Sequence, residues 1–290
     1  MVRIVLSETR QAQIYMIIAC MAFGCLWAMI RIASETVHPV LIVFYRTLFG
    51  FLSLTPFYIR EGKGAFATKK LKFHLIRGAS AVVATFCIFY AVTVVPLAKV
   101  VAITYVAPVF AALVAVIILK EKVHTRRIVS MVIGFIGVMV VLRPGSMALS
   151  LGEILAFFGA IGIAMTIIMI KVLSATERSE TVVAYSYAIV LPVSFLASLF
   201  IWKWPTWGEF GLLALVGIFV TIAQLFTVKA FSKADLTAIL PLDFIRLIFA
   251  TLFGYYLFGE PLDKWVWVGA SIILVSTIYI AHREAQVKKT

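Results

Sequence analysis

The feature that most constrains this chain is a succession of ten apolar stretches joined by short polar linkers. A helix rises about 1.5 Å per residue, so about 20 apolar residues cross the ~30 Å hydrocarbon layer of a bilayer. The stretches cover residues 12–33, 39–59, 73–94, 97–119, 126–142, 150–171, 181–202, 207–231, 236–258 and 264–281. We therefore predict an all-α membrane protein with ten transmembrane helices.

The composition agrees with a bilayer as the solvent. Of the 290 residues, 63% are hydrophobic and 13% are charged, whereas soluble domains carry about 25% charged residues. The net charge of +13 is spread over short clusters between the apolar stretches rather than gathered on one face or arm. The expected partners are therefore the lipid bilayer and a small-molecule substrate, and nucleic acid is excluded.

The three cysteines, Cys20, Cys25 and Cys87, all lie inside apolar stretches and lack the spacing of metal ligands. We interpret them as small buried apolar residues. The sequence thus predicts neither a metal site nor a cofactor.

The distribution of Lys and Arg predicts the orientation in the membrane. With a cytoplasmic N-terminus, eighteen of these residues fall on the cytoplasmic side and five on the outer side, as the positive-inside rule requires. Both termini are then cytoplasmic, and the first apolar stretch reads as a retained helix rather than a cleaved signal peptide. The short linkers and the absence of an organelle signal favour a multi-pass protein of the bacterial inner membrane.

The two halves of the chain resemble each other. RIASE from Arg31 and KVLSATE from Lys171 each close the first helix of a half, and TYVAPVFAALVAVIILKE from Thr104 matches DFIRLIFATLFGYYLFGE from Asp243. Each half contains five spans, an odd number, so the second half enters the membrane from the opposite side. We predict two inverted five-helix repeats, residues 1–145 and 146–290.

Three of these segments carry a family resemblance. VFYRTLFG at Val43, AITYVAPVFAALVAVIILKEKV at Ala102 and LPLDFIRLIFATLFGYYLFGEPL at Leu240 occur in this order. The chain resembles the drug/metabolite transporter superfamily, specifically a ten-helix protein with two EamA-type halves. The resemblance implies a secondary transporter with a central substrate site between the halves, and it leaves the substrate open. One chain contains both repeats, so a monomer is sufficient for transport; the sequence leaves the oligomeric state open.

Two charged residues lie inside the ninth apolar stretch. Asp243 is about seven residues, or ~10 Å, from the cytoplasmic end of the helix, and Arg246 lies near the midplane. A charge at this depth is costly unless it faces water or a partner, which marks it as a candidate functional group. Spaced three apart, the two side chains share one helix face. They form either a structural ion pair or a cavity-lining pair.

In the cavity-lining interpretation, Arg246 binds an anionic group of the substrate, and Asp243 binds an amine or accepts the coupling proton. Pro241 just before the pair favours this interpretation, because it frees backbone carbonyls where water or protein can meet them. A plain packing kink is the alternative for Pro241 and for Pro108, its displaced counterpart in the fourth stretch.

Two further arginines lie inside apolar stretches. Arg46 is about seven residues from the outer end of the second stretch, and the matched position in the other half is Ser186. Arg46 is therefore either a second contact for an anion or for Asp243, or a side chain that snorkels to the headgroups. Arg77 is about four residues from the inner end of the third stretch, and we expect it to snorkel as an anchor.

Several side chains with an aromatic ring or an amide complete the candidate substrate site. Rings with a polar tip suit a pocket for a planar or ammonium-bearing ligand, although such residues also face lipid or the interface. The candidates are Trp27, Tyr90, Tyr105, Tyr185 and Gln224.

The sequence favours a carrier that works by alternating access, either proton-coupled or exchanging solutes. Two arginines and one aspartate indicate an anionic or zwitterionic metabolite, such as an amino acid or an S-adenosylmethionine-like compound. A broad-specificity drug or metabolite exporter is the alternative. An enzyme is not expected, since the four histidines lie near helix ends or in loops and no HExxH or GxSxG motif occurs. A channel is disfavoured because no ring of like charge or filter sequence occurs.

Overall fold

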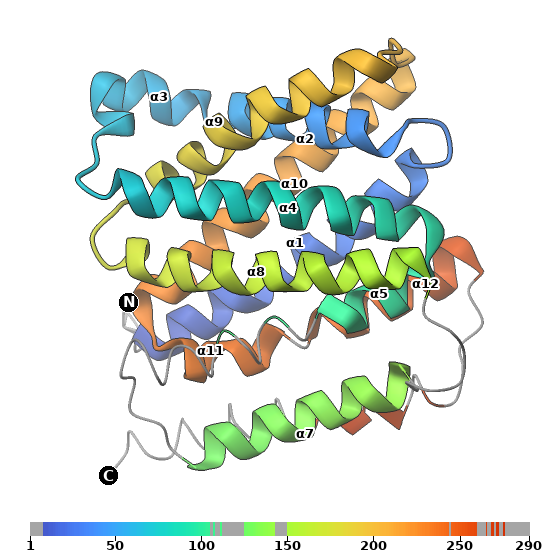
Figure 1. Ribbon diagram of the computed structural model, residues 1–290. Helices are drawn as coiled ribbons and strands as arrows, with labels where there is room; N and C mark the ends of the chain where they lie inside the picture. The colour runs from blue at the N-terminus through green and yellow to red at the C-terminus, as the bar shows by residue number, and fades with distance from the viewer. Residues whose placement is uncertain are drawn as a thin grey trace, which may run out of the picture.

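The computed structural model describes residues 8–104, 107, 111, 125–142, 150–243, 245–259, 265, 268, 269, 271, 272 and 275. All regular structure among these residues is helical, and the long helices lie roughly along one direction (Figure 1). Within the described ranges, five helices are long and apolar enough to cross a bilayer, and a bent helix pair provides a sixth span. The predicted all-α membrane fold is confirmed.

The first half of the chain contains seven described elements. They are α1 (Glu8–Ala33), α2 (Pro39–Ser53), α3 (Thr55–Glu61), the 3-10 helix η1 (Gly62–Phe66), α4 (Leu71–Val94), α5 (Leu97–Thr104) and α7 (Thr125–Leu142). The second half contains α8 (Leu151–Ser174), α9 (Ser179–Ser198), the 3-10 helix η2 (Leu199–Ile201), α10 (Trp207–Lys233), α11 (Leu236–Asp243) and α12 (Ile245–Phe258).

One predicted span is bent at a break among the described residues. The stretch 39–59 is divided into α2 and α3, which meet at an angle of 42°. Pro56 lies in the first turn of α3, where its missing N–H and fixed φ suit the start of a new helix. The stretch 236–258 is described as α11 and α12, and residue 244 between them lies outside the described residues. Residues 112–124 and 276–290, with most of the predicted fourth stretch, lie outside the described ranges.

The helices α8 and α10 begin with the same local signal. Ser150 Oγ accepts a hydrogen bond from the Glu153 N–H at 3.3 Å, and Glu153 Oε2 accepts one from the Ser150 N–H at 2.7 Å. Thr206 and Glu209 form the same reciprocal pair at the start of α10. Each capping box satisfies N–H groups that have no partner within the helix.

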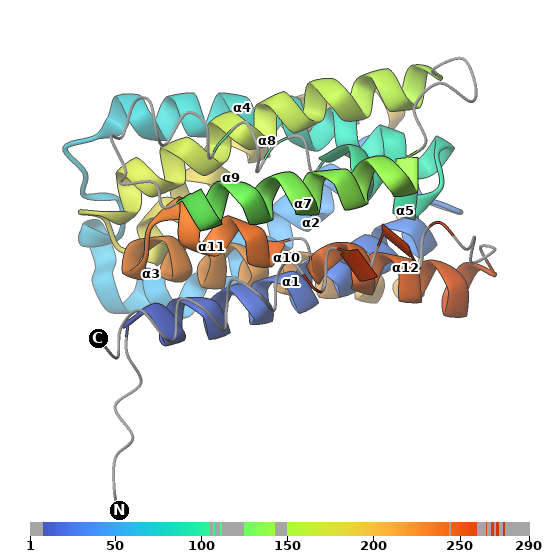
Figure 2. The ribbon, with the colours of Figure 1, turned by 90° about the horizontal axis from the view of Figure 1, so that it is seen from below.

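The two halves are related as inverted repeats. The first helices, α1 and α8, run in opposite directions, and so do the third helices, α4 and α10 (Figure 1). The first helix of each half packs along the third helix of the other, α1 along α10 and α4 along α8, on opposite sides of the bundle (Figure 2). Likewise, α2 packs on α9 and α5 on α12. Exchanging the halves therefore maps the contact of α1 with α10 onto that of α8 with α4, and the contact of α2 with α9 onto itself, as expected for inverted repeats.

Small residues allow the closest of these crossings. A Cβ atom at Gly162 of α8 would lie 2.9 Å from the Ser80 carbonyl oxygen of α4. A Cβ atom at Gly217 of α10 would lie 2.8 Å from the Gly50 backbone nitrogen of α2. Such distances are available only without a side chain, so the glycines let the backbones approach closely.

A basic residue at corresponding places in the two halves ties a first helix to the end of a third helix. Arg31, in the last turn of α1, donates from Nη1 to the Val92 carbonyl oxygen of α4. Lys171, in the last turn of α8, donates from Nζ to the carbonyl oxygens of Phe231 and Ala234 at 3.1 and 2.9 Å. A cation placed there satisfies carbonyls at the C-terminus of a helix and complements its dipole.

We expect Lys171→Met to lower the melting temperature of the purified protein by roughly 3–6 °C, because losing the charged donor to α10 costs about 1–2 kcal/mol. Thermal unfolding in detergent measures the change. Lys203→Met, at an exposed position before α10, is the control and should leave the melting temperature unchanged. Equal melting temperatures for both variants would contradict a stabilising role for Lys171.

Candidate functional site

A central cavity lies between the two halves of the bundle. Its volume, counted as the space open to the centre of a water molecule, is about 170 Å³. Side chains from α1, α2 and α4 of the first half and from α8, α9, α10, α11 and α12 of the second half line it. Its charged lining residues, among those that the structure describes, are Arg46, Arg77, Asp243 and Arg246. The wall is thus mostly apolar but carries three guanidinium groups and one carboxylate.

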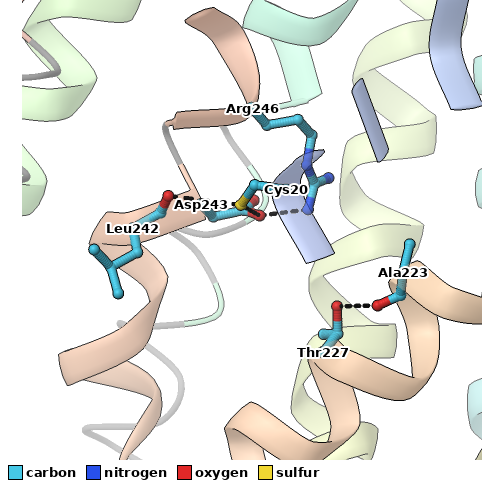
Figure 3. A network of polar contacts seen from close by, with 6 residues as sticks. All are labelled: Cys20, Ala223, Thr227, Leu242, Asp243 and Arg246. Carbon is cyan, nitrogen blue, oxygen red and sulfur yellow. Dashed lines mark hydrogen bonds and ion pairs between the residues drawn. The ribbon is translucent and has the colours of Figure 1, made fainter. Parts of the chain in front are cut away.

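Asp243, the last residue of α11, and Arg246, the second residue of α12, meet in the cavity wall. Arg246 Nη2 forms an ion pair with Asp243 Oδ1, and both residues line the cavity (Figure 3). The Cys20 thiol of α1 lies against the same acid, with Sγ 3.8 Å from Asp243 Oδ1 and 3.7 Å from the Leu242 carbonyl oxygen. The two residues, three apart in sequence, therefore form an ion pair and part of the cavity wall at the same time, so both sequence interpretations describe a part of the geometry.

Arg246 also reaches across to the first half. Its guanidinium carbon lies 4.1 Å from the centre of the Phe23 ring of α1. A guanidinium over an aromatic face is attracted by the ring quadrupole, most strongly where water is excluded. The contact ties α12 to α1 at the cavity wall.

Arg46 of α2 faces the cavity instead of the headgroups. Its side chain is 7% exposed, Nη2 donates to Thr85 Oγ1 of α4 at 3.2 Å, and the guanidinium carbon lies 4.9 Å from the centre of the Phe89 ring. Its Nε has no hydrogen-bond acceptor among the residues that the structure describes. Arg46 thus keeps its charge inside the bundle without a carboxylate beside it in the described ranges. Ser186, the matched position in the other half, also lines the cavity.

Arg77 corrects a prediction. We expected it to snorkel to the membrane surface, but its side chain is only 1% exposed and it lines the cavity. Nη1 donates to the Val182 carbonyl oxygen of α9 at 2.7 Å, and Nη2 donates to Gln224 Oε1 of α10 at 2.9 Å. Counting residues from the helix end gave the depth of Arg77 but not the face of α4 on which it lies, and that face points at the second half.

The predicted aromatic and amide residues divide into two groups. Trp27 and Gln224 line the cavity, together with Arg46, Asp243 and Arg246. Tyr90 and Tyr185 do not line it, and Tyr105 and Pro108 lie outside the described residues. The ring of Tyr90 is 39% exposed on the outside of the bundle.

Tyr185 lies near the N-terminal end of α9. Its ring stacks on His74 with 4.2 Å between the ring centres, and its hydroxyl donates to the Phe66 carbonyl oxygen of η1 at 2.7 Å. Tyr187 lines the cavity in its place, with its hydroxyl 2.9 Å from Thr221 Oγ1. Two residues along a helix turn by about 200°, so Tyr185 and Tyr187 lie on opposite faces of α9. Ser186, matched to Arg46, stands about 100° from both tyrosines, so the repeat did not tell which of them lines the cavity.

A smaller hollow of about 110 Å³ adjoins the central cavity. The two share Trp27, Arg46 and Thr85, and the hollow continues along Ile30 and Phe89. Ile30 and Phe89 lie near the ends of α1 and α4, towards the linkers that follow these helices. Arg46 therefore lies between the main cavity and that end of the bundle.

The comparison with known proteins identifies the family. The sequence matches the EamA-like transporter family twice, over residues 10–143 and 150–281. The chain belongs to this family. Both matches together cover nearly the whole chain, which confirms the two repeats, while the exact division between residues 145 and 146 stays a prediction.

Named relatives of this EamA-like transporter move small metabolites. The chain is 28% identical over 273 residues to the S-adenosylmethionine uptake transporter of Rickettsia prowazekii, which is 90% of this chain and 93% of the relative. It is 28% identical over 286 residues to the riboflavin transporter of Brucella anthropi, which is 95% of this chain and 100% of the relative. A solved structure described as "Crystal structure of protein" matches the fold with a TM-score of 0.75 over 97% of this chain and 99% of that chain, at 17% identity.

Family membership and the apolar helices give the general function. The chain is a multi-pass membrane protein that transports a small metabolite, and it is not an enzyme. Its described His, Cys, Asp and Glu residues form no cluster that could hold a metal ion.

We expect Asp243→Asn and Arg246→Ala each to abolish transport by the protein reconstituted in liposomes, because each substitution leaves the other member of the pair in the cavity wall without its ionic partner. Size-exclusion profiles and melting temperatures of the purified variants establish that they fold. Transport at the wild-type rate by both variants would assign the pair to structure alone.

Proposed function

We propose that this protein is a secondary transporter that moves a small anionic or zwitterionic metabolite by alternating access. The observation that carries the proposal is the charge of the cavity wall, where the buried Arg46 and Arg77 and the partly buried Arg246 meet one aspartate among the described residues. A buried guanidinium without a counterion is costly in a membrane protein. A substrate carboxylate or phosphate would supply the missing negative charge.

The remaining lining suits a substrate with a planar ring. Phe23, Trp27, Tyr187 and Phe231 contribute aromatic surface to the cavity, and aromatic rings bind planar or cationic ligands by stacking and by cation–π attraction. An amino acid or an S-adenosylmethionine-like compound combines a carboxylate with such groups. The Rickettsia relative named as an S-adenosylmethionine uptake transporter supports this class.

In this proposal Asp243 is the candidate for coupling. It lies in the cavity wall beside Arg246 and Cys20. An acid placed there could bind the amine of a zwitterionic substrate or accept a proton, and either event would change the partner that Arg246 holds. The transport cycle is then driven by protons or by exchange with a second solute.

The inverted repeats support alternating access. The packing of α1 on α10 and of α4 on α8 is exchanged by the symmetry of the halves, so the halves can rock about the central cavity to give two equivalent states. The cavity residues come from both halves, which supports a substrate site between the parts that would move.

A second candidate is a carrier of broader specificity for uncharged planar metabolites or drugs. The largely apolar lining and the relative named as a riboflavin transporter favour it. In that case aromatic stacking would dominate binding, and Arg46 would serve only to hold α2 against α4.

Arg46→Ala separates the two candidates. If Arg46 recognises charge, the variant should raise the KM for a probe that carries a carboxylate, S-adenosylmethionine, on the order of 10–100-fold, because the lost contact is a charge-assisted hydrogen bond. The KM for the uncharged probe riboflavin should change far less. Uptake of both probes into liposomes gives the two constants, and an equal loss for both would reject charge recognition by Arg46.

We also propose that the protein lies in a bacterial inner membrane with both termini in the cytoplasm. The excess of Lys and Arg in the linkers of one side supports this orientation. Single cysteines at Ser7 and at Lys203 should then react with an impermeant maleimide from inside and from outside the cell, respectively, with the parent protein as the control for Cys20, Cys25 and Cys87. Labelling of the Ser7 position from outside would overturn the orientation.

A further inference from the structure

Arg77 and Gln224 form a pair in the cavity wall that the charge argument leaves unexplained. The guanidinium of Arg77, on α4, bridges the second half by donating to the Val182 carbonyl oxygen of α9 and to Gln224 Oε1 of α10. With only 1% of its side chain exposed, Arg77 offers almost no surface to a ligand. Its charge is used to hold other groups in place.

The chemistry of this pair fixes the orientation of the Gln224 amide. A guanidinium has five N–H donors and no acceptor, so only the amide oxygen of Gln224 can face it. The amide NH2 group must then point away from Arg77. Gln224 lines the cavity and its side chain is partly exposed. In the part of the chain that the structure describes, its NH2 group donates no hydrogen bond.

We propose that Arg77 is a positioning residue that turns the Gln224 amide so that its NH2 group donates to the substrate. The inference rests on the proposed function, because it takes the central cavity as the substrate site. Gln224 then recognises a hydrogen-bond acceptor, such as a carbonyl oxygen, a ring nitrogen or a carboxylate oxygen. The Val182 carbonyl keeps the guanidinium in place, so the amide cannot flip without leaving Arg77 short of an acceptor.

This arrangement adds a second recognition point to the cavity. Arg46 binds an anionic group, and Gln224 binds an acceptor elsewhere on the same substrate. A donor fixed by a buried partner rejects ligands that present a donor or an apolar group at that point, because its own N–H groups would stay unpaired. The substrate class is therefore a metabolite that has an anionic group and a separate acceptor, as on a planar heterocycle.

Gln224→Glu tests the orientation directly. The carboxylate has the same shape and still accepts from Arg77, but it presents an oxygen to the cavity where the wild type presents NH2. The probes are S-adenosylmethionine and riboflavin. For each probe that the wild type carries, we expect the KM to rise on the order of 10–100-fold, because the carboxylate oxygen of the variant then faces a hydrogen-bond acceptor of the substrate. The melting temperature should stay equal or rise, since Arg77 gains a charged partner.

Variants of Arg77 test the positioning role. Arg77→Met frees the amide and should raise the KM several-fold without a matching fall in the maximal rate per folded protein, whereas Arg77→Lys keeps one donor to Gln224 and should restore part of the affinity. Gln224→Met removes the donor at similar volume and should raise the KM as Gln224→Glu does. Lys203→Met serves as the matched control outside the cavity.

The outcomes separate this inference from the function on which it rests. A wild-type protein that carries neither probe would overturn the proposed function. A wild type that carries one probe, together with an unchanged KM for that probe in Gln224→Glu and Gln224→Met, would overturn the donor role and leave the function standing. If both Arg77→Met and Arg77→Lys lower the maximal rate and leave the KM constant, Arg77 is only structural and the positioning role is wrong.

Discussion

A guanidinium group inside a bilayer must find partners within the protein, and three such groups determine how the centre of this bundle is built. Arg246 contacts Asp243 and the Phe23 ring, and Arg46 contacts Thr85 and the Phe89 ring. Arg77 donates to the Val182 carbonyl oxygen and to Gln224. Each arginine joins helices that are distant in sequence, because the cost of a bare charge exceeds the cost of holding a long side chain in one conformation. The cavity is the space that these contacts enclose.

The backbone of the two halves is symmetric, but the chemistry of the cavity is not. Arg31 and Lys171 occupy corresponding places at opposite ends of the bundle, and each donates to carbonyl oxygens at the end of a third helix. Arg46 and Ser186 also correspond, yet one is charged and the other is neutral. In the proposed alternating access, symmetric packing would give equivalent states towards both sides, whereas an asymmetric substrate needs an asymmetric wall. Arg46 and Ser186 mark a position where the packing of the two halves corresponds but the chemistry of the cavity wall differs.

Much of the fold and part of the site could be predicted. The apolar stretches predict the helices because a bilayer accepts hardly any other structure. Asp243 and Arg246 could be singled out because a charged side chain in a long apolar stretch is costly and by default marks a functional site. Tyr185 was a candidate for the site, but its neighbour Tyr187 lines the cavity instead. Composition does not tell which face of α9 points inward. Arg77 was misread because its depth from the helix end suited an anchor at the membrane surface.

The sequence by itself determined the class of the protein, the number and length of its apolar stretches, the duplication of the chain and the depth of each buried charge. These follow from hydrocarbon thickness and helix rise, which act on each segment separately. Only the tertiary structure decided which helix faces meet, and with them the pairing of Arg77 with Gln224 and the partition of aromatic residues between cavity and lipid. The physical reason is that lipid and protein neighbours are equally apolar, so the contacts between helices depend on shape and on hydrogen bonds that no single segment encodes.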